Sequence, residues 1–523
     1  MRTIEEAATL LGIIPNNFQL EAAIRQIGGE NVFLIHPTGS GKSAAAQIPA
    51  LIDISKTTIF IQPLSVLMEE QVAKMLSRQI KAGILRSEIG NVDHNNAVIK
   101  QLRAEQLNLL FLSPEKIISN KPIMKLIMEL IHKGQIERVV FDEAHIIIHW
   151  GSTFRRSYIE ALQFFTSQNV KFTFMTATAT DEIVEEIIHI TGKARHEFYF
   201  SKEPVLRPNI RFHISKCQNT NQLKQNIQQI VMRHFSQQRQ RGVIFVYRKK
   251  DIPMISLWLH EMKITPTMFH SDYSKLEKHM KLQFWTRPDK PSVLVSSIAF
   301  SMGVDVPDIG FTIHTTMNDN MASLVQETGR AGRNGDIAHS YLLWQSSNMG
   351  TRRRLINSNL QLSPEEKRRS LEELYMVETM YTALNSCTWS FICNYFDDFL
   401  TVTECGVCEI CIQPPQNRHI HDLTALGRSI IETFQVANLQ VTMSELVQTL
   451  TGKRPGHLQQ DIGFIERAAI GLENPKPILV SLISQLLREG NLRWDWRRSN
   501  TVHRRVLVFQ TEIRENQNFL IQA

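Results

Sequence analysis

The chain has 523 residues, too many for one hydrophobic core, so we expect about three or four domains. Hydrophobic residues make up 43% and charged residues 21%, which is typical of a soluble globular protein, and no apolar run reaches the roughly 18 residues of a membrane helix. The net charge of +7 fits a polyanionic partner and equally an ordinary basic surface, whereas Glu5 and Glu6 argue against a secretory signal and favour an intracellular protein.

Apolar runs of strand length recur through residues 1–205, each followed by a stretch long enough for a helix. That alternation predicts a parallel sheet covered by helices on both faces. Ligands of such sheets gather at the carboxyl ends of the strands. The five runs are residues 32–35, 58–61, 109–112, 139–141 and 172–175.

Residues 36–43 follow the first run and have the composition of a phosphate-binding loop. Glycines let backbone N–H groups turn toward a phosphate, the lysine ammonium meets its oxygens, and a serine hydroxyl can bind Mg²⁺. His36 stands where the motif has its first glycine, so an ordinary strand-to-helix turn is the alternative. The residues expected to contact the nucleotide are Thr38, Gly39, Ser40, Gly41, Lys42 and Ser43.

Asp142 and Glu143 follow the apolar run 139–141, which places two carboxylates at the end of a buried strand. One carboxylate can hold Mg²⁺ and the next can orient or deprotonate an attacking water, as hydrolysis of a phosphoanhydride requires. We assign Asp142 to the metal and Glu143 to the water. The alternative, two acids that begin a surface loop, is weakened by a phosphate loop upstream on what we expect to be a neighbouring strand.

A second series of strand-like runs begins after residue 206 and predicts a second lobe of the same class, up to about residue 350. Beyond it the pattern is helical, with a helix start predicted at Ser363 and Pro364, and residues 493–509 could form a hairpin. The four runs of the second lobe are residues 243–246, 293–295, 311–313 and 340–343.

Three of the six cysteines, Cys405, Cys408 and Cys411, are each separated by two residues. Such clustering in a large intracellular chain favours a metal site over disulfides.

Several motifs, taken together and in order, resemble those of superfamily-two helicases and more narrowly the RecQ family of DNA helicases. The resemblance covers the chain from about Gln19 to the cysteine cluster, and more thinly to the end. The motifs are the phosphate loop and residues 142–145, 149–151, 154–155, 176–178, 207–211, 299–305 and 326–335.

The resemblance implies an α/β fold with two RecA-like parallel-sheet lobes, residues 1–205 and 206–350, then a helical zinc-binding subdomain, 351–415, and a winged-helix domain, 416–523. It also implies an ATP-dependent DNA helicase that moves 3′ to 5′ on single strands and unwinds tailed duplexes, with ATP, Mg²⁺ and Zn²⁺ as cofactors. We expect the protein to act in DNA repair or recombination, in the nucleus if it is eukaryotic and otherwise in the cytoplasm, with no membrane partner. The alternatives are an RNA helicase or translocase of the same superfamily, and a DNA-binding or strand-annealing protein with weak unwinding.

The resemblance also assigns roles near the nucleotide. Gln19 would bind the adenine edge, although the preceding residues lack the family's aromatic and arginine, so adenine selectivity could be weak. Arg330 and Arg333 would come from the second lobe to neutralise γ-phosphate charge, with Arg333 favoured as the finger. Asp305 and Gln326 would couple the nucleotide to lobe closure.

For DNA, the resemblance implies that Trp150, Phe154 and Arg155 form the family's aromatic-rich loop, since aromatic faces stack on bases of any sequence. The alternative is that Trp150 and Phe154 belong to the core. Thr176 and Thr178 would either contact the DNA strand or brace the lobes.

For the metal, the resemblance implies Cys387 as the fourth ligand beside the three clustered cysteines. Four sulfurs would make a closed, structural Zn²⁺ site. Cys393 falls at an apolar helical position and is expected in the core.

Overall fold

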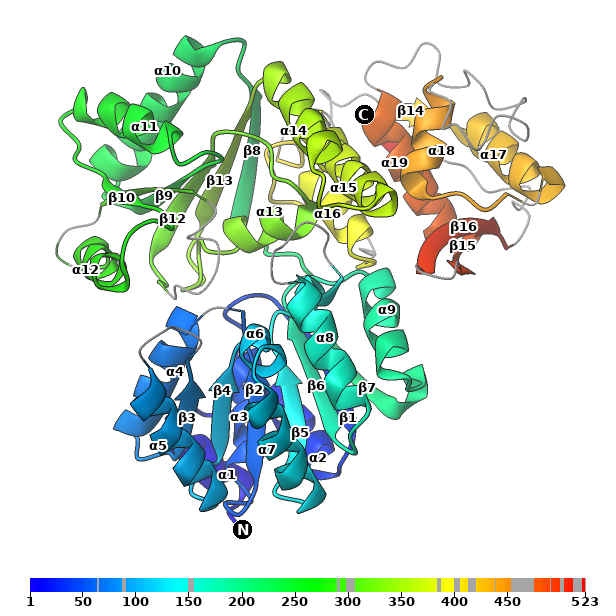
Figure 1. Cartoon of the computed structure of the whole chain (residues 1–523). Helices are drawn as coiled ribbons and strands as arrows, with labels where there is room; N and C mark the ends of the chain where they lie inside the picture. The colour runs from blue at the N-terminus through cyan, green and yellow to red at the C-terminus, as the bar shows by residue number, and fades with distance from the viewer. Residues whose placement is uncertain are drawn as a thin grey trace. The chain divides into compact units, whose positions relative to one another are not determined.

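The computed structural model contains two compact units, the first formed by Met1–Val205 and the second by the described residues from Leu206 onward (Figure 1). The structure describes residues 1–63, 65–86, 91–148, 155–287, 289, 292–297, 306–382, 387–398, 405–412, 420–437, 439–452, 475–489, 491–498, 503–510 and 520–522.

The first unit is built on a parallel sheet of seven strands in the order β3-β4-β2-β5-β6-β1-β7. All five predicted runs are strands, which confirms the predicted sheet. The short β3 and the edge strand β7 were not predicted. The strands are β1 Asn31–Ile35, β2 Thr57–Ile61, β3 Ala82–Leu85, β4 Leu109–Leu112, β5 Ile136–Phe141, β6 Lys171–Thr176 and β7 Phe198–Lys202.

Helices cover both faces of this sheet (Figure 1). On β1, Val32 and Leu34 belong to one buried apolar cluster, and Phe33 and Ile35 belong to another, because successive strand residues point to opposite faces. The helices are α1 Ile4–Leu10, α2 Asn17–Ile27, α3 Lys42–Ala50, α4 Ser65–Ser77, α5 Val92–Arg103, α6 Pro114–Ile118, α7 Lys121–His132, η1 Ala144–Ile147, α8 Arg155–Thr166, α9 Asp181–Thr191 and η2 Arg195–Glu197.

The second unit contains a six-stranded parallel sheet in the order β10-β11-β9-β12-β13-β8, as a second lobe of the same class predicts. The strands are β8 Ile210–Lys216, β9 Arg241–Val246, β10 Thr267–Phe269, β11 Val293–Ser297, β12 Ile309–His314 and β13 Ala338–Trp344. The helices among them are α10 Thr220–Val231, the π-helix η3 Met232–Gln237, α11 Asp251–His260, α12 Lys275–Trp285 and α13 Met321–Thr328.

Helices dominate after the second sheet, as predicted. The helix start at Ser363 is confirmed, because its hydroxyl accepts from Glu366 N (3.2 Å) and its own N–H donates to the Glu366 carboxylate (2.7 Å). The predicted hairpin is the antiparallel pair β15 and β16. The elements are α14 Ser346–Ser358, α15 Pro364–Thr382, α16 Thr388–Tyr395, β14 Ile420–Asp422, α17 Thr424–Ala437, α18 Met443–Leu450, α19 Pro475–Arg488, β15 Leu492–Arg498, β16 His503–Phe509 and β17 Leu520–Gln522.

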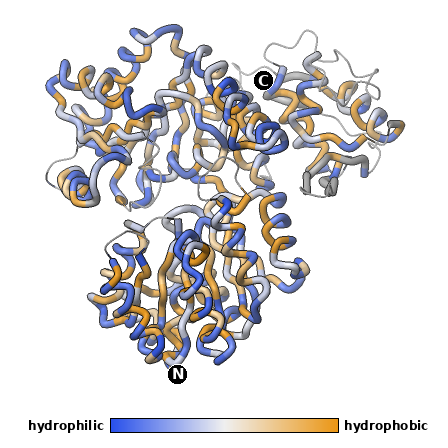
Figure 2. The backbone as a smooth tube through the Cα atoms, viewed as in Figure 1, coloured by the Kyte–Doolittle hydropathy of each residue, from blue (hydrophilic) through white to orange (hydrophobic). Residues whose placement is uncertain are grey.

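Hydrophobic residues concentrate in the strands of both sheets, and hydrophilic residues predominate on the outer turns of the helices (Figure 2). Within the described part of the chain, no helix combines the length and the apolar character needed to cross a membrane.

Candidate functional site

The phosphate loop joins β1 to α3, and both of its glycines have left-handed backbones. The φ angles are 88° at Gly39 and 92° at Gly41, a region that glycine enters without the steric cost other residues carry. A Cβ on Gly41 would lie 2.2 Å from Nε2 of Gln19, so a larger residue there would displace the Gln19 amide. Because Gly41 precedes the first turn of α3, the helix N-terminus opens at the loop, which suits an anion.

The ammonium group of Lys42 is turned back onto the loop. It donates to the carbonyl oxygens of His36 (2.7 Å) and Pro37 (3.0 Å). These are the neutral acceptors that anionic phosphate oxygens would replace, since hydrogen bonds to charged acceptors are stronger.

The amide of Gln19 contacts the same loop. Its Nε2 donates to the carbonyl of Gly41 (3.1 Å), and its Oε1 accepts from the N–H of Asn16 (2.9 Å). Asn16 in turn caps α2 by accepting from the N–H of Gln19 (3.0 Å). The capping box therefore fixes Gln19 beside the loop, and its contact with adenine stays a prediction.

His36, the departure from the loop motif, is anchored by three contacts that sequence reasoning missed. It is 1% exposed, its ring stacks on Phe18 at 4.0 Å, and its Nε2 lies 2.8 Å from the hydroxyl of Ser201. Its Nδ1 lies 3.3 Å from the carboxylate of Glu203. Burial lowers the pKa of His36, and Glu203 partly opposes that change. An imidazole here ties the loop to the edge strand β7.

Asp142, at the end of β5, is held by two hydrogen bonds. One oxygen accepts from Nε2 of Gln62 (2.7 Å), which follows the neighbouring strand β2, and the other accepts from the N–H of Glu143 (3.0 Å). Burial raises the pKa of Asp142, while Gln62 and the positive charge of Lys42 lower it. The predicted lysine and the first predicted carboxylate thus interact electrostatically.

The second carboxylate, Glu143, has a left-handed backbone (φ 49°), and its Oε2 lies 3.4 Å from Nδ1 of His145. The same Nδ1 lies 2.8 Å from the hydroxyl of Thr176. That hydroxyl also donates to the carbonyl of Thr178 (3.1 Å). A polar chain therefore links Glu143 to the end of β6.

One expectation changes here. The phosphate loop and the carboxylates do not lie on neighbouring strands, because β6 separates β1 from β5. Thr176 and Thr178 are 0% and 1% exposed and bond to each other within the first unit, and their role in contacting DNA or bracing the lobes stays a prediction.

Some predicted residues cannot be placed. Trp150, Phe154 and Asp305 lie outside the described residues, and Arg155 is described only as the first residue of α8. Nearby, Tyr158 of α8 donates its hydroxyl to the carbonyl of Asp142 (3.1 Å), another contact that sequence reasoning missed.

In the second unit, the predicted Gln326, Arg330 and Arg333 lie on α13 and the turn after it. Gln326 and Arg330 are buried, at 9% and 2% exposed, and Arg333 is half-buried. Gly332, between the two arginines, has a left-handed backbone (φ 61°).

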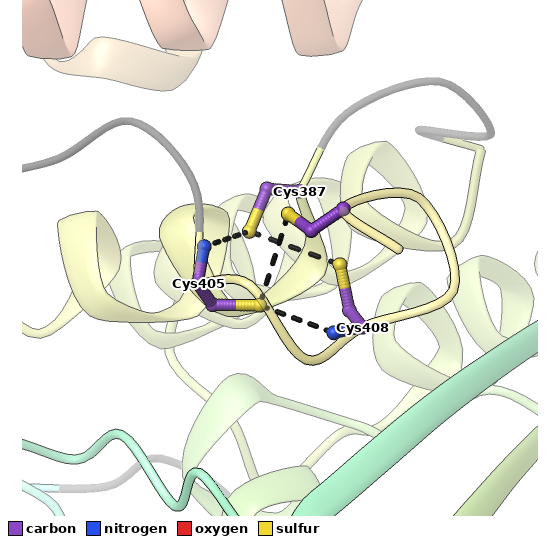
Figure 3. A group of neighbouring side chains, drawn as sticks. Cys387, Cys405 and Cys408 are labelled. Atoms are coloured by element: carbon purple, nitrogen blue, oxygen red, sulfur yellow. Dashed lines mark hydrogen bonds between the residues drawn. The ribbon is translucent and has the colours of Figure 1, made fainter. Parts of the chain in front are cut away.

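The four predicted metal ligands converge in the second unit, and the labelled sulfurs point toward a common centre (Figure 3). Their Sγ atoms all lie within 4.8 Å of one another, and the Cys405–Cys411 and Cys387–Cys408 pairs are 3.9 Å apart. Zn–S bonds of about 2.3 Å in a tetrahedron would separate the sulfurs by about 3.8 Å. The site therefore fits Zn²⁺ with four thiolates and no open position.

Backbone N–H groups point at two of these sulfurs. Cys387 caps α16 by accepting from the N–H of Ser390 (3.3 Å), and Cys405 accepts from the N–H groups of Val407 (3.4 Å) and Cys408 (3.2 Å). Hydrogen bonds among the four thiols lower the pKa values of Cys405 and Cys408 and raise the pKa of Cys387. Hydrogen bonds with Cys405 and Cys408 also raise the pKa of Cys411. Backbone donors of this kind favour the charged sulfur that a metal requires.

Cys393 is fully buried on α16, where the sequence predicted a core residue.

Three family models match successive segments of the chain. The DEAD/DEAH box helicase model matches residues 16–187, the helicase conserved C-terminal domain model matches 221–335, and the RecQ zinc-binding model matches 346–412. Together these segments cover more than half of the chain.

Two curated proteins illustrate the similarity. The ATP-dependent helicase SGS1 of Saccharomyces cerevisiae is 29% identical over 493 residues, which are 92% of this chain and 33% of the yeast protein. The ATP-dependent DNA helicase RecQ of Haemophilus influenzae is 27% identical over 425 residues, 79% of this chain and 65% of that protein. The chain thus spans about a third of the length of the yeast relative.

Among solved structures, the Mycobacterium smegmatis helicase Lhr bound to ssDNA and AMP-PNP has a TM-score of 0.53 at 16% identity, and the match covers 76% of this chain and 55% of that one. This likeness concerns the fold. The three matched models, the two parallel-sheet lobes and the four-cysteine site together show that the chain belongs to the RecQ family of superfamily-two helicases.

Proposed function

We propose that this protein is an ATP-dependent DNA helicase that couples ATP hydrolysis to 3′ to 5′ movement on single-stranded DNA and to unwinding of tailed duplexes. The observation that carries the proposal is the phosphate loop between β1 and α3, where Gly39 and Gly41 have left-handed backbones, together with the carboxylates of Asp142 and Glu143 that follow β5 of the same sheet. The named relatives, which are ATP-dependent helicases, support the same activity.

In this proposal, Lys42 exchanges the carbonyls of His36 and Pro37 for the β- and γ-phosphate oxygens of ATP. Ser43 and Asp142 are the residues that would hold Mg²⁺, which supplies charge neutralisation on the phosphates when bound. Glu143 then orients the attacking water and accepts its proton.

Other predicted residues complete the site. Gln19 binds the adenine, and Arg333, with Arg330, supplies positive charge from the second unit in the transition state. Gln326 and Asp305 couple nucleotide state to closure of the lobes. Hydrolysis then depends on that closure, which is how a motor of this kind steps.

We further propose that DNA contacts the aromatic-rich loop at Trp150, Phe154 and Arg155, and that residues 416–523 form a winged-helix domain for the duplex. Residues 1–205 and 206–350 are the two motor lobes, and the zinc ion supported by residues 351–415 is structural. The activity fits DNA repair and recombination, in a nucleus or in a bacterial cytoplasm.

Strand separation on a 3′-tailed duplex tests the proposal, with a 5′-tailed duplex for polarity and a tailed RNA duplex for substrate class. The wild type should unwind the 3′-tailed DNA only with ATP, and Lys42→Ala should lose this activity while keeping its melting temperature. Equal strand separation by both proteins would contradict a motor. Faster unwinding of RNA would favour the RNA helicase alternative, and ATP-independent annealing would favour a scaffold.

Adenine selectivity is measured in the same preparation by comparing ATP with GTP hydrolysis. Because Asn16 caps α2 in the segment where the family has its arginine, we expect a smaller preference for ATP than an adenine sandwich would give. A preference of about 100-fold or more would contradict that expectation.

A further inference from the structure

The turn between Arg330 and Arg333 is held by two side chains from a distant part of the sequence. The carbonyl of Gly332 accepts from Nη2 of Arg207 (2.9 Å) and from Nδ2 of Asn209 (2.8 Å). Arg207 and Asn209 stand 125 and 123 residues earlier, directly before β8. One carbonyl oxygen thus joins the arginine-bearing turn to the start of the edge strand.

Asn209 bonds to two carbonyls of the segment that follows α13, those of Gly332 and Asp336. Its Nδ2 also donates to the carbonyl of Asp336 (2.9 Å), while the N–H of Gly332 donates to Ile309 on β12 (2.9 Å). The packing is tight, because a Cβ on Gly332 would lie 2.5 Å from Nδ2 of Asn209 and 2.9 Å from the carbonyl of Asp336. The left-handed turn therefore has little room to shift around these contacts.

Asn209 is itself fixed by two neighbouring elements. Its carbonyl accepts from the N–H of Ala338 on β13 (2.9 Å). The next carbonyl, that of Ile210, accepts from the indole Nε1 of Trp389 (2.9 Å), which is 1% exposed and packs edge-on against Phe212. Trp389 follows the metal ligand Cys387 by two residues, so the metal-binding module and the arginine turn meet at the same strand end.

The charges at this turn also interact. Burial lowers the pKa of Arg207, and the positive charge of Arg333 lowers it further, so the two guanidinium groups are close enough to repel each other. The hydrogen bond from Arg207 to the carbonyl of Gly332 offsets part of the unfavourable free energy of burying the Arg207 charge near Arg333.

We propose that Arg207 and Asn209 are positioning residues for ATP hydrolysis, which hold the Gly332 turn so that Arg330 and Arg333 present their guanidinium groups to the nucleotide in a fixed direction. This inference rests on the proposed ATPase. A displacement of about 1 Å in a catalytic group can cost up to about 100-fold in rate, so a loosened turn should slow the chemical step more than it weakens ATP binding.

The test uses the full chain, loaded with zinc and saturated with single-stranded DNA. Asn209→Asp is isosteric but replaces the two amide donations with repulsion, and Arg207→Ala removes the other donor, whereas Arg207→Lys keeps the charge and a donor. We expect kcat to fall about 10- to 100-fold in the first two variants, with KM for ATP within about twofold, and to recover in Arg207→Lys.

Asn219→Ala is the matched control, because Asn219 caps α10 in the same unit by accepting from the N–H of Gln222 (2.9 Å). It should cost a comparable stability and leave kcat unchanged. Hydrogen exchange of residues 329–337 gives a readout independent of hydrolysis, and exchange there should accelerate in Asn209→Asp and not in Asn219→Ala.

The outcomes separate the two proposals. If the wild type does not hydrolyse ATP but Asn209→Asp still accelerates exchange in the turn, the clamp is supported and the proposed ATPase is contradicted. Wild-type kcat and exchange in Asn209→Asp would overturn the inference and leave the ATPase intact. The inference would also be overturned if Arg207→Lys did not restore kcat and if kcat fell in proportion to melting temperature in all variants, Asn219→Ala included.

Discussion

Arg138 on β5 is a buried cation whose loss should loosen the helix that carries Gln19. Its Nη2 donates to the carbonyls of Gln26 (2.8 Å) and Glu30 (2.9 Å), which lie at and just beyond the end of α2. Its Nη1 donates to the hydroxyl of Thr173 (3.0 Å) and to the carbonyl of Phe172 (3.3 Å), both on β6. Burial lowers the pKa of Arg138 to about 10, so the side chain remains charged at neutral pH.

Arg138→Met keeps most of the apolar stem and removes every donor. Two carbonyls at the end of α2 would lose their charged partner, and hydrogen bonds to charged groups contribute about 1.5–3 kcal/mol each. Relief from burying a cation opposes this loss. We therefore expect a net destabilisation of about 2–4 kcal/mol in the first unit.

Thermal unfolding measures this loss, and hydrogen exchange of Asn17–Ile27 localises it to α2. The control is Arg156→Met, because Arg156 is 90% exposed and pairs with Glu160 along α8, a solvent-screened contact that contributes little to stability. If Arg138→Met were as stable as Arg156→Met, and α2 exchanged no faster, the reasoning about the buried guanidinium would be refuted.

Three further predictions concern the sites. Burial raises the pKa of Asp142, so the stability that its protonated carboxyl contributes is present at low pH and is lost as pH rises through that pKa. Asp142→Asn should therefore raise the melting temperature at pH 8, and it should slow hydrolysis by about 100-fold or more. A lower melting temperature of the variant at pH 8 would contradict this. Burial, with the nearby charge of His234, lowers the pKa of His339 to about 4. The free energy of unfolding should therefore decrease as pH falls from about 6.5 toward 4, and His339→Gln should flatten this dependence. The same dependence of stability on pH in His339→Gln and the wild type would contradict it. Cys408→Ser should lose the zinc ion of the four-cysteine site and melt at a lower temperature, and full zinc content by elemental analysis would refute the zinc assignment.

Local patterns in the sequence determined much of this molecule. Long apolar runs predicted the central strands, because a strand buried on both faces has few polar residues. The edge strands β7 and β8 carry more polar residues and escaped that signal. The spacing of Cys405, Cys408 and Cys411 predicted a metal site, because close ligands need little chain between them.

The tertiary structure alone decided which strands are neighbours and which distant side chains meet. Strand order placed β6 between the loop and the carboxylates, which brings Thr176 to His145. It also brought Gln62 to Asp142, and Asn209 to the turn at Gly332. The sequence specifies periodicity and short-range spacing, whereas the pairing of parallel strands depends on how the crossover helices pack, and these contacts between remote residues have no local signature.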